Sequence, residues 1–367
     1  MTAQPDHIKQ TETGRIIISV DVMGGDLGPA TVIAGLDASA RENADIGFIA
    51  HGPKEEIEKL LSRRKRLVGR VVVRDARDVV AMGDKPSHVV RNGKNTSMWS
   101  ALECVRTGEA TVAVSCGNTG ALMALSMIRL RKLPGVNRPA IAILFPSRNP
   151  QGFNLMLDAG ADVRADARDL LQYAMMGASY ARNGLSLRRP RVGLLNVGTE
   201  EHKGRSELKE AHDLIGLSAS AADFDYVGFV EGSDIPGDAA DVIVTDGFTG
   251  NIAIKTGEGT ATLIGDLLRQ AFRYTPLSRL AYLLALTSMR RLKQRIDPRR
   301  VNGGVFLGLN GTVVKSHGSA DATGVSAAVR LAFQLAKSGF TEKLAARVAS
   351  IAPLQQDTSE PPENGAA

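Results

Sequence analysis

Three cationic side chains in predicted loops could carry out chemistry in this chain: Lys203, Lys315 and His317. Lys203 follows a predicted buried strand, and the other two lie at the end of an apolar strand just before a helix. Such groups bind phosphate, stabilise an oxyanion or transfer a proton. A solvated lysine or a structural histidine would give the same pattern, so both interpretations stay open for each residue.

Glycine-rich turns after two further strands are suited to binding anions. The runs 117–120 and 247–251 each lead into a helix, where glycine allows close backbone approach and unpaired N–H groups point outward. Polar residues also follow the strands that end near 20 and 195. The candidate substrate-binding residues are Gly24, Gly25, Asn118, Thr119, Gly120, Asn196, Asp246, Asn251 and Lys315.

Several familiar chemistries have no motif in the sequence. There is no Walker A ending, no Gly-x-Gly-x-x-Gly after the first strand, and no His-Glu-x-x-His, cysteine pair or Gly-x-Ser-x-Gly. A covalent acyl-enzyme, a zinc site and a nicotinamide cofactor are therefore not indicated, and we expect neither metal nor cofactor. Asp21, Asp26, Asp158 and Asp246 could hold magnesium in principle, but turn and helix-cap roles at strand ends are the favoured explanation.

The elements that must position these residues alternate between strand and helix. Apolar runs at 15–20, 46–50, 71–74, 111–115, 140–144, 154–158, 191–195 and 241–245 are separated mostly by helical stretches. This rhythm predicts an α/β fold with a mainly parallel sheet and helices on both faces, which binds ligands beyond the carboxyl ends of its strands. We expect one catalytic domain at 15–350, a flexible segment at 1–14, and a disordered tail at 351–367.

Composition is compatible with this fold and limits the partners. The chain is 43% hydrophobic with 38 glycines, and 45 Lys and Arg against 39 Asp and Glu give a net charge of +6. A basic protein favours acidic partners, which include nucleic acid, anionic lipid, acidic protein and phosphate. Cys104 and Cys116 are too few for a disulfide framework and indicate reduced thiols in the cytosol, and the polar start shows no secretory signal.

The segment 271–298 differs from the rest and is expected to protrude as an amphipathic helix. Its apolar part, 277–289, is too short to cross a membrane, for which about 20 apolar residues are needed. A basic helix with an apolar face is typical of a segment lying on an anionic membrane, although a dimer or lobe-packing helix fits the pattern too. The candidate membrane or carrier contacts are Leu277, Leu280, Leu284, Arg290, Arg291 and Lys293.

An ordered set of motifs resembles the bacterial fatty acyl-acyl carrier protein:phosphate acyltransferase family. The resemblance extends from about residue 16 to residue 346. Its motifs are 20–26 (VDVMGGD), 84–87 (DKPS), 95–98 (NTSM), 115–121 (SCGNTGA), 134–139 (PGVNRP), 194–198 (LLNVG), 229–232 (FVEG), 246–251 (DGFTGN), 307–311 (LGLNG) and 315–318 (KSHG).

This resemblance implies a fold similar to isocitrate and isopropylmalate dehydrogenases and phosphotransacetylase, a homodimer and no cofactor. It also implies a peripheral protein at the inner face of the cell membrane that passes acyl phosphate to a membrane glycerol-3-phosphate acyltransferase. One departure is visible, because Asp162 stands where the family has an asparagine. A carboxylate would repel phosphate, so Asp162 is left out of the predicted site.

We therefore expect transfer of a long-chain acyl group from acyl carrier protein to inorganic phosphate, for phospholipid synthesis, with Lys203 and His317 as the catalytic candidates. Phosphate is itself the nucleophile, so holding it against the thioester is the main task. The alternatives are a short-chain phosphotransacetylase acting on acetyl-coenzyme A, an isocitrate-type dehydrogenase, and a scaffold that recruits the carrier without chemistry. Nucleic-acid binding ranks last, because the cations lack interleaved aromatic residues.

Overall fold

The computed structural model describes residues 14–296 and 303–357, and its side chains except those at 293–296 and 350–357. The strands are β1 (Ile16–Asp21), β2 (Ile46–Gly52), β3 (Val71–Asp75), β4 (Val112–Ser115), β5 (Ala140–Pro146), β6 (Phe153–Leu157), β7 (Arg191–Leu195), β8 (Asp225–Val230), β9 (Val242–Val244), β10 (Gly304–Leu307) and β11 (Thr312–Lys315).

Helices connect most of these strands. They are α1 (Pro29–Glu42), α2 (Lys54–Leu61), α3 (Pro86–Asn92), α4 (Ser97–Arg106), α5 (Thr119–Arg129), α6 (Ala167–Leu185), α7 (Ser206–Ser218), α8 (Gly247–Arg273), α9 (Pro276–Leu284), α10 (Leu286–Ile296), α11 (Ala322–Ser338) and α12 (Phe340–Asp357), with 3₁₀ turns at Lys65–Leu67, Gly93–Asn95 and Gly232–Asp234. Residues 351–357, for which the sequence predicts disorder, belong to α12, which includes Pro353 and ends at Asp357, before the proline pair at 361–362. The remaining parts of the predicted flexible ends, 1–13 and 358–367, lie outside the described residues.

All eleven strands described form one sheet, in the order β3-β2-β1-β4-β11-β10-β5-β6-β9-β7-β8. Two parallel groups, β3 to β11 and β6 to β8, are joined through antiparallel pairs that involve β10 and β5. The predicted mainly parallel α/β sheet is thus confirmed, with a reversal of strand direction at its centre. The strands β1, β4 and β11 are neighbours and run parallel, so the loops that follow them lie at the same edge of the sheet.

Helices cover both faces, as near-continuous apolar strands require. In β4, Val112 and Val114 pack into the core beneath α1, α6 and α11, whereas Ala113 faces the opposite core, beneath α4, α5 and α8. The alternation repeats in β6, where Leu155 and Leu157 face the first core and Met156 the second. Side chains of a strand point alternately to its two faces, so strands such as β4 and β6 contribute to both cores, while Ile17 of β1 and Ile49 of β2 belong to a third, smaller cluster.

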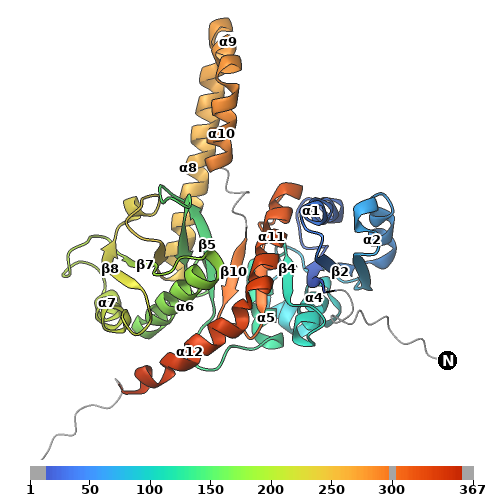
Figure 1. The fold of residues 1–367 in the computed structure, drawn as a ribbon. Coiled ribbons are helices and arrows are strands. Elements are labelled where there is room, and N and C mark those ends of the chain that lie inside the picture. The colour runs from blue at the N-terminus through green and yellow to red at the C-terminus, as the bar shows by residue number, and fades with distance from the viewer. Residues whose placement is uncertain (1–13, 297–302, 358–367) are drawn as a thin grey trace, which may run out of the picture.

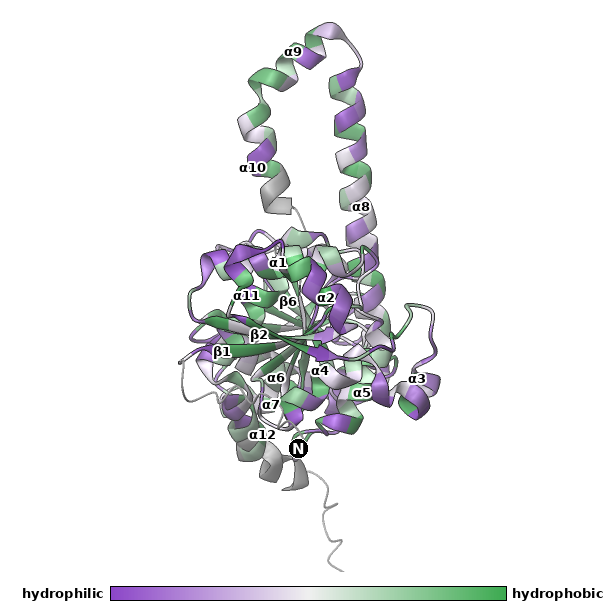
Figure 2. Cartoon of the chain, turned by 90° about the vertical axis from the view of Figure 1, so that its right-hand side faces the viewer, coloured by the Kyte–Doolittle hydropathy of each residue, from purple (hydrophilic) through white to green (hydrophobic). Residues whose placement is uncertain are grey.

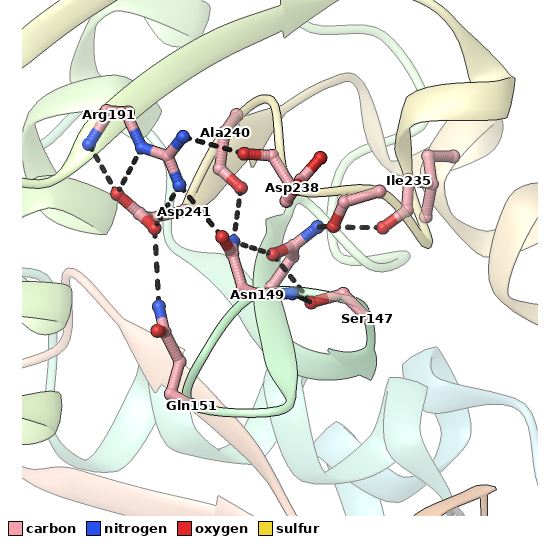
Figure 3. Close-up of polar contacts among 10 residues, drawn as sticks. Ser147, Asn149, Gln151, Arg191, Ile235, Asp238, Ala240 and Asp241 are labelled. Carbon is pink, nitrogen blue, oxygen red and sulfur yellow. Dashed lines mark hydrogen bonds and ion pairs between the residues drawn. The ribbon is translucent and has the colours of Figure 1, made fainter.

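A buried polar network holds the amino-terminal ends of β6, β7 and β9 together (Figure 3). The side chain of Arg191 donates to both oxygens of Asp241, at 3.1 and 3.0 Å, and to Oδ1 of Asn149 at 2.8 Å. Asn149 in turn donates to Asn154 and to the carbonyl of Ala240. Buried amides and charges are tolerated only when paired in this way. In β6, β7 and β9 the network lies at the opposite strand ends from the loops that hold Asp162, Asn196 and Asp246.

A helical projection leaves the body at the distal half of α8 and returns through α9 and α10 (Figure 1). Figure 2 shows apolar residues distributed along these helices. The rings of Phe272 and Tyr282, with centroids 5.2 Å apart, join the end of α8 to α9. No helix in the described part of the chain is long and apolar enough to cross a membrane.

Candidate functional site

The turn after β1 is braced by the buried carboxylate of Asp21. Its Oδ1 accepts from the hydroxyl of Ser97 at 2.7 Å and from the backbone N–H of Met23 at 3.2 Å. Its Oδ2 accepts from the hydroxyl of Ser115 at 2.7 Å. Burial raises the pKa of Asp21, against the lowering effect of these hydrogen bonds. The carboxylate thereby connects β1, α4 and β4 next to the turns that follow β1 and β4.

The turns after β1, β4 and β11 touch one another through glycine. A Cβ on Gly24 would lie 2.6 Å from the backbone nitrogen of Gly117, so no larger residue fits there. The N–H of Asp26 donates to the carbonyl of Gly318 at 2.8 Å. Three of the sequence motifs therefore meet at one place, on a floor made largely of backbone. Gly25 packs at the same place, because a Cβ on this residue would lie 3.4 Å from the side chain of Cys116.

Asn118, a predicted substrate ligand, is occupied by structural contacts. Its Oδ1 caps α5 by accepting from the N–H of Ala121 at 3.0 Å. Its Nδ2 donates to the carbonyls of Met82 and Asp84, at 2.9 Å each. The side chain therefore fixes the loop before α3 against α5, while Thr119 and Gly120 stay exposed at the start of α5. A substrate role for this turn would fall to those two residues.

Lys315, the last residue of β11, is a buried cation at the centre of the three turns. Its side chain is 8% exposed overall, and its Nζ donates to the carbonyls of Cys116, at 3.4 Å, and Ser316. Burial lowers the pKa of Lys315 to about 8, although Cys116, Asp26 and Asp21 act in the opposite direction. Burial also raises the pKa of Cys116 to about 11, so this thiol is a poor nucleophile. The residue with a proton available near neutral pH is Lys315.

His317 lies two residues further on, at the surface of the same turn. Its Nδ1 faces the backbone N–H of Ser319 at 3.3 Å and the hydroxyl of Ser319 at 2.8 Å. Because a backbone N–H can only donate, Nδ1 is the unprotonated nitrogen and Nε2 carries the hydrogen in the neutral ring. Burial lowers the pKa of His317, and Lys255 and Lys315 lower it further. His317 is thus placed as a neutral N–H donor beside Lys315.

The remaining candidates gather around the start of α8. The carboxylate of Asp246 accepts from the N–H of Thr249 at 2.7 Å and forms an ion pair with Arg205. Asn196 donates to the carbonyl of Lys203 at 3.2 Å, and its buried Oδ1 has no hydrogen-bond partner among the described residues. Lys203 itself is 43% exposed and pairs with Glu200 at 2.8 Å. This hydrogen-bonded pairing raises the pKa of Lys203, which makes it a poor proton donor near neutral pH.

Three of the four carboxylates that could have bound a metal, those of Asp21, Asp158 and Asp246, have other partners. Asp158 accepts from the backbone N–H groups of Ile141, Gly160, Ala161 and Asp162. Across residues 14–296 and 303–357, no three His, Cys, Asp or Glu side chains come together as a metal centre requires. Asp162, the residue that departs from the family pattern, forms an ion pair with Arg138, whose guanidinium donates to Oδ1 at 2.7 Å.

Comparison with known proteins identifies the family. The chain matches the model described as fatty acid synthesis protein over residues 16–343. A phosphate acyltransferase of Ruegeria pomeroyi is 73% identical over 361 residues, which is 98% of this chain and 97% of that protein. The chain belongs to this family, the phosphate acyltransferases. It is therefore an enzyme, and the resemblance seen in the sequence is confirmed. A relative in Paracoccus denitrificans, also a phosphate acyltransferase, is 72% identical over 334 residues, 91% of this chain and 90% of that protein.

Solved structures share the fold of this phosphate acyltransferase family member. A phosphotransacetylase from Streptococcus pyogenes aligns with a TM-score of 0.59 and 17% identity, over 88% of this chain and 94% of that chain. The EutD phosphotransacetylase from Staphylococcus aureus aligns with a TM-score of 0.55 and 13% identity, over 88% and 95%. At these identities the likeness concerns the fold, and it agrees with the predicted fold class.

Two residues of the site were absent from the sequence prediction. Arg205 pairs with Asp246, and Lys255 acts electrostatically on both His317 and Lys315. Helical spacing could have found Lys255, since it follows the candidate Asn251 by four residues. No sequence signal marks Arg205, because its partner is 41 residues away in the chain.

Proposed function

We propose that this enzyme transfers a long-chain fatty acyl group from acyl carrier protein to inorganic phosphate, forming an acyl phosphate. The observation that carries the proposal is the buried ammonium of Lys315 between the glycine-lined turns after β1, β4 and β11. A cation in a site of low polarity binds a phosphate dianion far more strongly than one in water. Membership of the phosphate acyltransferase family supports the same reaction.

The proposed reaction needs one bond made and one bond broken. An oxygen of phosphate attacks the thioester carbonyl carbon, the carbon–sulfur bond breaks, and the electron pair leaves with the sulfur. Lys315 gives its proton to the departing thiolate and recovers one from the attacking phosphate, so the products are acyl phosphate and the free thiol. The Nε2–H of His317 stabilises the oxyanion of the tetrahedral intermediate. Lys203, which the sequence favours as a second catalytic residue, is proposed only to attract anions at the rim.

The helical projection is proposed to meet the carrier protein and the membrane. Leu277, Leu280 and Leu284 of α9 share one helical face and are 76%, 54% and 82% exposed. Arg290 and Arg291 follow in α10, and Lys293 belongs to α10 although its side chain lies outside the described residues. An apolar face with adjacent cations suits an anionic bilayer or an acidic carrier. Acyl phosphate made there would pass to a membrane glycerol-3-phosphate acyltransferase at the inner face of the cell membrane.

A homodimer is also proposed, with α8 as part of its interface. Phe248, Ile252, Leu263 and Leu267 are each at least half exposed along this helix. Large exposed apolar side chains at helical spacing are typical of a surface that another helix covers. Replacing Leu263 and Leu267 with glutamine should lower the molar mass measured by light scattering from dimer to monomer. An unchanged mass would exclude this part of α8 from the interface.

A comparison of acyl donors tests the substrate assignment. The enzyme is given palmitoyl-acyl carrier protein, palmitoyl-coenzyme A or acetyl-coenzyme A with phosphate, and acyl phosphate is trapped with hydroxylamine. We expect the highest kcat/KM with the carrier-bound long chain. A preference for acetyl-coenzyme A would instead identify a short-chain phosphotransacetylase, the activity named for the structural neighbours. Carrier binding without any hydroxamate would favour the scaffold alternative.

The membrane assignment has its own test. Flotation with vesicles of phosphatidylglycerol and phosphatidylcholine should recover the wild-type enzyme with the lipid. Leu280→Gln combined with Leu284→Gln should leave the enzyme in the soluble fraction, while activity on a soluble thioester is retained. Equal recovery of both proteins would contradict membrane contact through α9.

A further inference from the structure

Helix α8 is held close to the body by glycines on one of its sides. A Cβ on Gly250 would lie 1.9 Å from the carbonyl oxygen of Asp158, and one on Gly257 would lie 2.6 Å from the ring of Phe145. These two positions are seven residues apart and so face the same way. The rotation of α8 about its own axis is therefore fixed, and with it the direction of every other side chain on its first three turns.

A polar stripe runs along a neighbouring side of the helix. Asn251, Lys255 and Glu258 are spaced by four and three residues, which places them one above another. Asn251 lies at the turn after β6, where a Cβ on Gly160 would come within 3.5 Å of it. One turn further along, Lys255 acts electrostatically on His317 and Lys315, and Glu258 acts on His317. The stripe therefore lies within electrostatic range of the turn after β11.

The ammonium of Lys255 can leave its present partner, Glu258, for a stronger one. Its Nζ lies 2.8 Å from Oε2 of Glu258, and its side chain is 56% exposed. A half-exposed lysine–glutamate pair within one helix contributes little to stability. A phosphate dianion between Lys255 and the buried Lys315 would offer more charge and more acceptor oxygens than the single carboxylate of Glu258.

We propose that Lys255 binds a phosphoryl group of a substrate, from the side of the site opposite to Lys315 and His317. Its ammonium leaves Glu258 when the phosphoryl group binds. Helix α8 thereby supplies a second cation to the site, in addition to Lys315 of β11. This inference rests on the proposed function. The phosphoryl group is either inorganic phosphate or the phosphodiester of the carrier's pantetheine arm, and the experiment below separates them.

The test compares Lys255→Gln with Lys255→Arg and with a control, Lys209→Gln, in which an exposed lysine of α7 is changed. Initial rates are measured with palmitoyl-acyl carrier protein and with palmitoyl-pantetheine, which lacks the phosphodiester. Loss of one charge-assisted contact should raise a KM about tenfold or more in Lys255→Gln. The arginine variant should recover most of the loss, and the control should match the wild type.

The KM that changes identifies the source of the phosphoryl group. A higher KM for phosphate with both donors assigns Lys255 to inorganic phosphate. A higher KM for the carrier donor alone assigns it to the phosphodiester. If neither KM moves by more than twofold, the proposal is wrong. These alternatives can be read from rates because Lys255 lies on the helix surface and its replacement leaves the core intact.

A second readout does not depend on turnover. Titration of phosphate into the protein by calorimetry should show weaker binding in Lys255→Gln than in the wild type and the control. The NMR titration of His317 should shift to a higher pH in the same variant, since a neighbouring positive charge has been removed. If the wild type makes no acyl phosphate but these two differences appear, the proposed function fails while the binding role of Lys255 stands. Unchanged titrations would overturn the binding role.

Discussion

The ammonium of Lys315, at the end of β11, donates to the carbonyl of Cys116, 3.4 Å away in the turn after β4. This contact places a charge inside the structure rather than in solvent, and the parallel pairing of β11 with β4 makes it possible by ending both strands at one level. A lysine held by carbonyls in a buried turn loses solvation, which is why its pKa falls to about 8. It can then both bind an anion and release a proton near neutral pH.

The first prediction concerns the pH dependence of turnover. If the Lys315 ammonium protonates the departing thiolate, kcat should fall as the pH rises through about 8, because the charged form is lost above that value. Lys315→Met should lower kcat by about 100-fold or more and remove this limb of the profile. Stopped-time assays from pH 6 to 9.5 measure both effects. A wild-type profile that stays flat up to pH 9 would assign the proton to another group.

The second prediction uses two glycines of the same helix. Gly250→Ala places a methyl group against the carbonyl of Asp158 and should cost about 2 kcal/mol or more, with loss of activity as α8 moves. Gly259→Ala meets no atom within 4 Å and should stabilise the helix by about 1 kcal/mol. Urea unfolding of the two variants measures the difference. Equal effects would mean that α8 does not pack against the turn after β6 as described.

A third prediction concerns the network in Figure 3. Arg191→Ala leaves the largely buried carboxylate of Asp241 without its ion-pair partner and should lower the free energy of unfolding by about 2 kcal/mol or more. Arg189→Ala breaks an exposed pair with Asp225 and should cost less than about 1 kcal/mol. Activity per folded molecule should be unchanged in both, since the network includes none of the candidate site residues. A drop in kcat for Arg191→Ala at full folding would contradict this separation.

A fourth prediction follows from a buried histidine. His51 lies 2.8 Å from the hydroxyls of Ser19 and Ser100, and Ser19 gives its own hydrogen to the carbonyl of Ala101, so Nε2 of His51 is the donor. Burial, with Arg74, lowers the pKa of His51 to about 3. Between about pH 6.5 and pH 3 the unfolded chain therefore binds a proton that the folded chain does not.

Stability should fall with decreasing pH over that range, by about 1.4 kcal/mol per pH unit from this one group. The stability of His51→Gln should be lower at pH 7, yet its difference from the wild type should shrink steadily toward pH 4. Denaturant titrations at half-unit steps of pH give this difference directly. A difference that stays constant would mean that His51 is protonated in the folded protein.

The sequence predicted most strands well but could not show how the sheet is joined. Strands such as β1 and β6 are mostly apolar runs, and their positions follow from that pattern. By contrast, β8 has exposed positions and a glycine, Gly228, at a φ of 84°, so its apolar signal is interrupted. The reversal of direction at β10 and β5 depends on pairing between distant segments, which no local pattern contains.

Within the candidate site, residue type was predictable and burial was not. Lys203 and Lys315 both appear as loop lysines in the sequence, yet one pairs with a glutamate in solvent and the other is enclosed by three turns. Asn118 appeared available for substrate, but the loop at 82–84 takes both of its donors. The contacts of Lys315 with Cys116 and of Asn118 with the loop at 82–84 span 34 to 199 residues of sequence, which a spacing argument cannot supply.

The central claim is tested most directly by the balance between thiol and acyl phosphate. Palmitoyl-acyl carrier protein and phosphate are incubated with the enzyme, free carrier thiol is titrated, and acyl phosphate is quantified by ³¹P NMR. The proposed reaction predicts one acyl phosphate for each thiol released, no thiol release without phosphate, and loss of both products in Lys315→Met. Thiol release that continues without phosphate, or the absence of an acyl phosphate resonance, would contradict it.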